Sequence, residues 1–212
     1  MGKVITISQS KGGSCKTTTA INLCGALNEL GYKSIVLDMD KDKPDAMEWL
    51  SQGKDNANGI KFVEPLFSET PSKDIQEYKK IYDYIILDTP PNYMKAAFKA
   101  VLMADFIILP CSPSFLDQHN LVEAMEIPQE SGKPFKLLIS KFQKRHNLSN
   151  TLQSDINGNE IGFKSVITSK SKIVESPFYG EWIGTFDKGS ESHKEFMSVA
   201  KEIVEILSKS HV

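Results

Sequence analysis

A short run near the amino terminus combines glycine, lysine and hydroxyl side chains at a spacing suited to holding phosphate. It reads Lys11-Gly12-Gly13-Ser14-Cys15-Lys16-Thr17-Thr18. A β-branched apolar stretch precedes it and an amphipathic stretch follows, so we expect a strand, a loop and a helix in that order. Such a loop directs backbone N–H groups and the positive end of a helix at one point, which suits a phosphate group. We expect Lys16 to reach the outer phosphates and the Thr17 hydroxyl to ligate Mg²⁺.

Three carboxylates lie at or just past the ends of apolar runs, namely Asp38, Asp40 and Asp88. Open α/β sheets place their sites at the carboxyl ends of strands, so these side chains are candidates for the same site. A carboxylate there can position an attacking water, while a metal ion and lysines neutralise phosphoryl charge. Asp88 closes an apolar strand and needs a partner, which a metal-bound water would supply. For Asp38, hydrogen bonding to the backbone of the following loop is an equally good interpretation.

The elements that position these residues alternate along the chain, with short apolar runs between longer amphipathic ones. The expected strands are Val4–Ser8, Ser34–Asp38, Tyr84–Asp88, Phe106–Pro110, Phe135–Ser140 and Phe163–Ile167, with Ile60–Val63 as a weaker candidate. The expected helices are Thr17–Leu30, Asn92–Met103, Leu116–Ile127 and Ser190–Ser208. This alternation predicts an α/β fold of three layers, with a mostly parallel twisted sheet covered by helices on both faces. Because neither a linker nor a repeat interrupts it, we expect one domain over residues 1–212.

Composition is that of an ordinary globular protein. The 212 residues are 40% hydrophobic and 25% charged, which excludes a disordered chain and a fibrous repeat. Three cysteines without a paired spacing fit a reducing compartment. No uncharged apolar run reaches the length of a membrane span, so we expect a cytoplasmic protein. The four histidines show no metal-ligand spacing.

Charge is unevenly distributed although the net charge is only −2. Residues 133–172 carry eight basic side chains against two acidic ones. A solvated surface and a polyanion-binding patch both remain open as interpretations. Only Arg145 among the 25 cationic side chains is arginine, which favours phosphate contacts over reading of bases.

The phosphate-binding run departs from the GxxxxGK[ST] pattern, because Ser10 and Cys15 occupy its glycine positions. Its form, KGGxxKTT, resembles the deviant Walker A motif of the ParA/MinD class of P-loop ATPases. Residues 35–40 look like the second motif of that class, and residues 82–91 look like its Walker B strand with the Pro-Pro turn. Residues 104–117 are similar to the short ParA-type plasmid partition ATPases, and the late stretch 166–180 matches more loosely. The likeness therefore extends along nearly the whole chain.

The resemblance implies an ATP hydrolase that uses ATP and Mg²⁺. Lys11 would be the signature lysine, which reaches into the partner's site when two copies sandwich two ATP molecules as a homodimer. Asp40 would orient the attacking water, and Asp88 would hold a magnesium-bound water. Residues 11–18 would bind the nucleotide, with Lys141 and Phe142 near the adenine.

Members of the class bind DNA without sequence preference when ATP has made them dimers. The resemblance places that surface at Lys170, Lys172 and Lys188, and it implies a bacterial cytoplasmic protein associated with the nucleoid in its ATP state. A centromere-binding or other adaptor protein would stimulate hydrolysis, and the cargo would be plasmid or chromosomal DNA. The segment 191–212 has a mixed solvent face that argues against a membrane anchor. The alternatives are a VirC-type ATPase that recruits DNA-processing proteins in conjugal transfer, and a nucleotide-binding scaffold with little hydrolysis.

Two departures from the class pattern affect the expected chemistry. Asp40-Lys41-Asp42 stands where Asp-Pro-Gln is usual, so Asp42 could share the water-positioning task. Cys15 replaces a glycine, and a Cβ there costs about 1–2 kcal/mol if the loop needs a positive φ. A thiol beside a helix N-terminus and lysines could also be reactive, although simple tolerance is the plainer interpretation.

Overall fold

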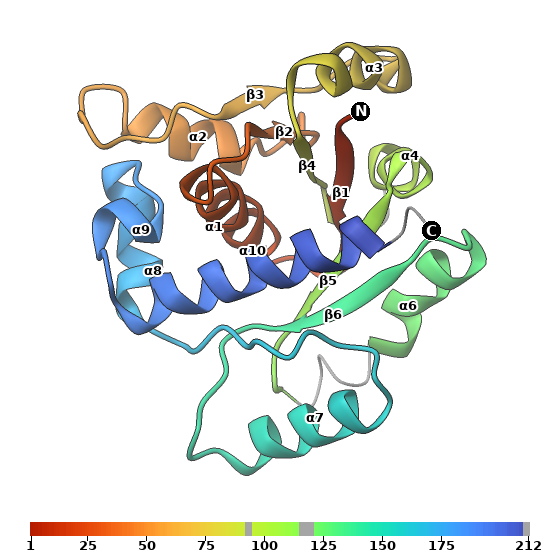
Figure 1. The fold of residues 1–212 in the computed structure, drawn as a ribbon, viewed down its shortest axis with the longest axis vertical. Helices are drawn as coiled ribbons and strands as arrows, with labels where there is room; N and C mark the ends of the chain where they lie inside the picture. The colour runs from red at the N-terminus through yellow and green to blue at the C-terminus, as the bar shows by residue number, and fades with distance from the viewer. Residues whose placement is uncertain (92–94, 115–120, 210–212) are drawn as a thin grey trace.

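A six-stranded parallel sheet forms the centre of the molecule (Figure 1). The computed structural model describes residues 1–91, 95–114 and 121–209. Along the sheet the strand order is β3-β2-β4-β1-β5-β6. The strands are β1 (Lys3–Ile7), β2 (Ser34–Asp38), β3 (Val63–Pro65), β4 (Tyr84–Asp88), β5 (Phe106–Cys111) and β6 (Phe135–Ile139). The predicted parallel α/β fold is confirmed.

Helices cover both faces of the sheet, which explains why most residues of its strands are apolar. The helices are α1 (Lys16–Glu29), α2 (Asp45–Gln52), α3 (Pro71–Ile81), α4 (Lys95–Met103), α6 (Leu121–Glu130), α7 (Asn147–Gly158), α8 (Ser171–Glu175), α9 (Ile183–Phe186) and α10 (Glu191–Lys209), with a 3₁₀ turn η1 (Ser176–Tyr179). None of these described helices combines the length and the apolar character that crossing a membrane requires.

Alternate residues of each strand pack on opposite faces. Ile86 of β4 faces a core formed with α1, α2 and α10, whereas Ile85 and Leu87 face a core that includes Ile75 of α3 and Ala100 of α4. Helices α1 and α10 lie against each other on the first face, where α10 runs across the view in Figure 1. Burial on both faces holds the strand ends in register, so the loops that follow β1, β2, β4 and β6 meet at one edge.

Five of the expected strands recur, two of them, β2 and β4, with the expected bounds and the others shifted by one residue at one or both ends. Two expected helices, Thr17–Leu30 and Ser190–Ser208, recur as α1 and α10 with shifts of one residue. Helix α4 begins at Lys95, and residues 92–94 of the predicted helix lie outside the described part of the chain. The same holds for residues 116–120 of the predicted Leu116–Ile127, where α6 begins at Leu121. The weak candidate Ile60–Val63 is displaced, because β3 begins only at Val63.

One predicted strand, Phe163–Ile167, is wrong. Two isolated bridges, Leu137 with Gly162 and Phe142 with Thr168, flank the segment. The segment bonds β6 only at its ends, where the N–H of Phe163 donates to the carbonyl oxygen of Leu137 at 2.9 Å and the N–H of Ile167 donates to that of Ile139 at 2.8 Å. Between these contacts the backbone N–H groups of residues 164 and 165 donate to the carboxylate of Glu202, each at 2.9 Å. A side chain from α10 therefore interrupts the pairing that a continuous strand would have.

Candidate nucleotide site

The loop between β1 and α1 leaves open space where a phosphate group would lie. Gly13 has a φ of 73°, and a Cβ added at Gly12 or Gly13 would meet nothing within 4 Å. Cys15 is the residue before α1 and provides no side-chain cap, so the first backbone N–H groups of the helix are available to a ligand. Cys15 has a φ of 67°, so the positive φ considered for this position is present.

A pocket of about 560 Å³ lies over this loop. Its floor and walls come from four strand ends and from the segment between β6 and α10. The lining comprises residues 12–19, Asp40, Asp42, Lys43, Asp45, Asp88, Thr89, Pro91, Ser140, Lys141, residues 167–170, Ile173, Val174, Pro177 and Phe196. The pocket is therefore polar and charged around the loop and apolar around residues 173–177. That arrangement suits a nucleotide, because its phosphates are charged and its base is largely apolar.

Lys16 is buried in the pocket, with 8% of its surface exposed. Its Nζ donates a hydrogen bond to the carbonyl oxygen of Lys11 at 3.2 Å. Burial lowers the pKa of the Lys16 amine, while the negative charges of Asp88 and Asp40 act in the opposite direction. A desolvated amine held beside an open loop is ready to pair with phosphate oxygens.

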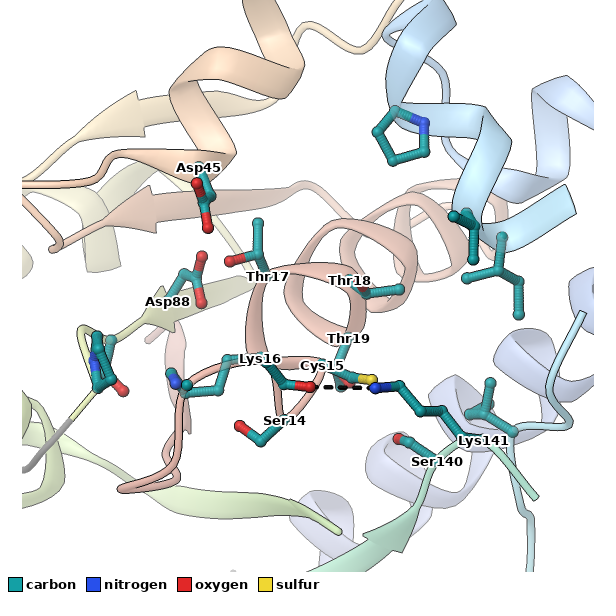
Figure 2. A pocket seen from close by; sticks show the side chains of 18 of the residues that line it. Ser14, Cys15, Lys16, Thr17, Thr18, Thr19, Asp45, Asp88, Ser140 and Lys141 are labelled. Atoms are coloured by element: carbon teal, nitrogen blue, oxygen red, sulfur yellow. Dashed lines mark hydrogen bonds between the residues drawn. The ribbon is translucent and has the colours of Figure 1, made fainter. Parts of the chain in front are cut away.

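Asp88 lies at the end of β4 and is 4% exposed. Burial raises the pKa of its carboxyl group to about 7, while the Thr17 hydroxyl acts in the opposite direction. Figure 2 shows the side chains of Thr17, Asp45 and Asp88 close together above the loop. The Oδ1 atom of Asp88 has no hydrogen-bond partner among the described residues. A buried acceptor without a partner is costly, so this oxygen favours a bound ligand or its water.

These residues fit a magnesium ion that is bound together with a nucleotide. No group of three or more His, Cys, Asp or Glu side chains in the described ranges could hold a metal by itself. Magnesium usually takes few protein ligands and relies on phosphate oxygens and water for the others. Thr17 at the loop and the unpaired oxygen of Asp88 match that pattern.

The two carboxylates after β2 have different surroundings. Asp38 is fully buried and accepts hydrogen bonds from the backbone N–H groups of Asp40 at 3.0 Å and of Ala46 and Met47 at 3.1 Å. It therefore bonds the following loop and the start of α2, which confirms the structural interpretation. Asp40 lines the pocket instead, and its Oδ1 accepts the backbone N–H of Lys43 at 3.0 Å. Asp42 also lines the pocket.

Lys141 and Phe142, the two residues expected near the adenine, have different surroundings in the structure. Lys141 follows β6 with a φ of 56°, and its Nζ donates to the carbonyl oxygen of Gly13 at 3.2 Å, drawn as the dashed line in Figure 2. Phe142 is 5% exposed and packs in the core with Leu152 and Ile156 of α7. The prediction for the Phe142 side chain is corrected, because an apolar ring next to a strand is drawn into the core. Lys141 alone reaches the pocket.

The family model described as "CobQ/CobB/MinD/ParA nucleotide binding domain" matches residues 5–183. The chain belongs to this family. The expected class, the ParA/MinD P-loop ATPases, is therefore confirmed.

The chromosome partitioning protein ParA of Myxococcus xanthus is 23% identical over 96% of this chain and 88% of its own length. The maintenance of carboxysome distribution protein A of Gloeobacter kilaueensis is 32% identical over 68% of this chain and 65% of its own. The structure of the septum site-determining protein MinD of Pyrococcus horikoshii, complexed with Mg-ADP, superposes with a TM-score of 0.79 at 20% identity and covers 98% of both chains.

The remaining residues assigned by the ParA/MinD resemblance lie at the edge of the pocket or outside it. Lys11 is exposed, and the lining of the pocket begins at Gly12. Lys170 lines the pocket and forms an ion pair with Glu191 at 2.9 Å. Lys172 pairs with Glu175 at 3.0 Å. Lys188 lines a separate surface hollow near the end of α1. The three lysines predicted to contact DNA thus do not converge on one spot.

Ser140 and Thr168 are among the pocket residues that the sequence interpretation did not assign to the site. Ser140 directly follows β6 with 3% exposure, and its Oγ lacks a hydrogen-bond partner among the described residues. Thr168 also lines the pocket and is 7% exposed. The position of Ser140 just past an apolar strand was a usable signal, because Asp88 was found in the same way. Thr168 directly follows the predicted strand Phe163–Ile167, so the sequence offered the same signal there, although that strand does not form.

Proposed function

We propose that this ParA/MinD-family ATPase binds Mg-ATP in the described pocket and positions cargo by cycling between ATP-bound and free states. The supporting observation is the open loop at Gly12 and Gly13 facing two buried groups, the Lys16 amine and the unpaired oxygen of Asp88. The MinD relative was crystallised with Mg-ADP, which agrees with this assignment.

The roles proposed for the residues in hydrolysis are based on their positions in the pocket. Lys16 and the first N–H groups of α1 bind the phosphates, and Thr17 and Asp88 hold the metal and its water. The magnesium ion, when bound with ATP, neutralises charge on the phosphate oxygens. Asp40 orients the attacking water from the wall that it shares with Asp42. Lys11, exposed beside the loop, extends into the site of a second copy, so that ATP joins two chains.

The proposed cargo is DNA, held without sequence preference by lysines that include Lys170, Lys172 and Lys188, with an adaptor protein that stimulates hydrolysis. Lysines on two copies would add several weak phosphate contacts, so binding should fall steeply with salt. The names of the relatives from Myxococcus and Gloeobacter refer to chromosome partitioning and carboxysome distribution, and both support a positioning role.

A scaffold that binds nucleotide and barely hydrolyses it is the second candidate. One observation favours it: an oxygen of Asp40 is occupied by the backbone N–H of Lys43. That contact holds the carboxylate against its own loop, in a segment whose Asp-Lys-Asp sequence departs from the family pattern. A turnover measurement on the purified chain with a DNA-bound adaptor would decide between the two.

Size-exclusion chromatography with Mg-ATP, with and without DNA, tests the proposal most directly. We expect the wild-type chain to shift to dimer mass with ATP and to bind DNA only then. Lys16→Ala should abolish nucleotide binding, whereas Lys11→Ala should retain the nucleotide and lose the dimer. Lys54→Ala, which changes an exposed lysine outside the pocket, is the matched control. A dimer that survives Lys11→Ala would contradict the sandwich arrangement, and a wild-type chain that retains no nucleotide would refute the proposal as a whole.

A further inference from the structure

One wall of the pocket belongs to a segment that lies beside β6 without forming a strand. Residues 167–170 line the pocket, and the segment 163–167 bonds β6 only through the N–H groups of its two end residues. A pair of carboxylates on α10, Glu195 and Glu202, also holds this segment. They are seven residues apart, about two helical turns, so both face the segment from the same side of the helix.

The two carboxylates make the same kind of contact at different distances from the pocket. Glu202 accepts the backbone N–H groups of Lys164 and Ser165 and the Ser165 hydroxyl, where the segment is remote from the pocket lining. Glu195 accepts the backbone N–H of Thr168 at 2.9 Å and also its hydroxyl. Thr168 itself lines the pocket. The chain thus contains one carboxylate contact at the pocket wall and a matched one outside it.

Helix α10 ties this wall to the core. Phe196, next to Glu195, is 1% exposed and lines the pocket as well as the core beneath α1. A residue anchored so firmly fixes the position of its neighbour on the helix. Both Glu195 contacts are charge-assisted hydrogen bonds, which are stronger than neutral ones. They also satisfy a backbone donor that would otherwise be buried without a partner.

Thr168 lines the pocket together with the apolar Ile173, Val174 and Pro177, which follow it in the chain, whereas the phosphate loop contributes residues 12–19. A nucleotide with its phosphates at the loop would place its sugar and base against the apolar residues. A change in the position of Thr168 should therefore alter affinity for the nucleoside part and leave phosphate chemistry unchanged.

We propose that Glu195 is a positioning residue that holds Thr168 against the nucleoside part of the bound nucleotide. The proposal rests on the function proposed above. Under this proposal, a residue of α10, which lies outside the nucleotide-binding motifs, contributes to the affinity for the sugar and base of ATP. Glu202 performs the same structural task for a part of the segment that ATP does not contact.

The test compares Glu195→Ala with Glu202→Ala in the full-length chain. Four quantities are measured: the Mg-ATP dissociation constant, KM and kcat for ATP hydrolysis, the inhibition constant of inorganic tripolyphosphate, and Tm. For Glu195→Ala we expect Kd and KM to rise about tenfold, the loss of about 1.4 kcal/mol of binding. The kcat and the tripolyphosphate constant should stay within about twofold of wild type. Glu202→Ala should lower Tm comparably and leave the Kd for ATP unchanged.

Two conservative variants keep the test decisive if Glu195→Ala does not fold. Glu195→Gln retains an acceptor for the Thr168 N–H and should restore most of the affinity. Glu195→Asp retains the charge, but its side chain is one methylene shorter, so the carboxylate lies farther from Thr168 and KM should rise. Wild-type affinity in Glu195→Asp, an equal rise in Kd with Glu202→Ala, or a parallel loss of tripolyphosphate binding would each overturn the inference. A wild-type chain that fails to bind ATP would instead refute the proposed function itself.

Discussion

The side chains of Thr17, at the start of α1, and Asp88, at the end of β4, lie close together in Figure 2. The phosphate loop thus meets the end of β4, because β1 and β4 are neighbours in the sheet. The Thr17 hydroxyl lowers the pKa of Asp88 but does not outweigh burial, which raises that pKa from 3.8 to about 7. In the nucleotide-free chain the carboxyl group is therefore protonated below neutral pH.

This pKa predicts how stability depends on pH. Between pH 3.8 and about 7 the folded state binds a proton at Asp88 that the unfolded state has released, so the free energy of unfolding falls as the pH rises through that window. Asp88→Asn removes this titration. Without nucleotide, we expect the difference between the Tm of the variant and the Tm of wild type to increase in favour of the variant from pH 5 to pH 8, as measured by calorimetry. Parallel Tm curves for the two proteins would contradict the prediction.

Cys15→Gly should stabilise the chain. Cys15 has a φ of 67°, a left-handed conformation that costs an L residue about 1–2 kcal/mol. Glycine removes that cost but adds about 0.4–1 kcal/mol of unfolded-state entropy. We expect a net gain of up to about 1 kcal/mol in the free energy of unfolding, measured by urea denaturation. Cys15→Ala keeps the Cβ and is the control, and an equal gain with alanine would mean that backbone strain is not the cause.

Asp40→Ala should remove ATP turnover while ATP binding persists. Asp40 lines the pocket beside Asp42, outside the loop that binds phosphate. Loss of a residue that orients the attacking water should lower kcat by about 100-fold or more. We expect a stable ATP-bound dimer on size-exclusion chromatography and a smaller loss with Asp42→Ala. Unchanged turnover in Asp40→Ala would remove it from the catalytic residues, and equal losses would show that the two carboxylates share the task.

Glu191→Gln should strengthen DNA binding. Glu191 forms ion pairs with Lys144 at 2.6 Å and with Lys170 at 2.9 Å, so it neutralises two cations of the basic segment 133–172. Removing its charge should raise DNA affinity roughly two- to fivefold at low salt and steepen the salt dependence. The measurement is fluorescence anisotropy with a DNA duplex in the presence of Mg-ATP. The combined change Lys172→Glu and Lys188→Glu should act in the opposite direction with unchanged ATP affinity. Equal DNA binding in all variants would place the DNA surface elsewhere.

Much of the phosphate side of the site was predictable, because its signals are local. A glycine- and lysine-rich loop between a strand and a helix has one usual arrangement, and Asp88 directly follows an apolar strand. Burial on both faces made the strands readable as apolar runs, and their alternation with helices predicted the parallel sheet. Spacing along the chain was sufficient for these features.

The tertiary structure decided what depends on contacts between distant segments. The stretch Phe163–Ile167 has the composition of a strand, yet its backbone bonds to Glu202, 37 and 38 positions away. The Phe142 ring packs in the core beside β6, and the Asp38 carboxylate accepts a hydrogen bond from the backbone of α2. Local pattern cannot predict which of several acceptors a backbone N–H will meet, because that choice is made only when the helices pack on the sheet. The wall formed by residues 167–170 is therefore determined by packing, whereas the phosphate loop can be recognised from the sequence, because its residues are neighbours in the chain.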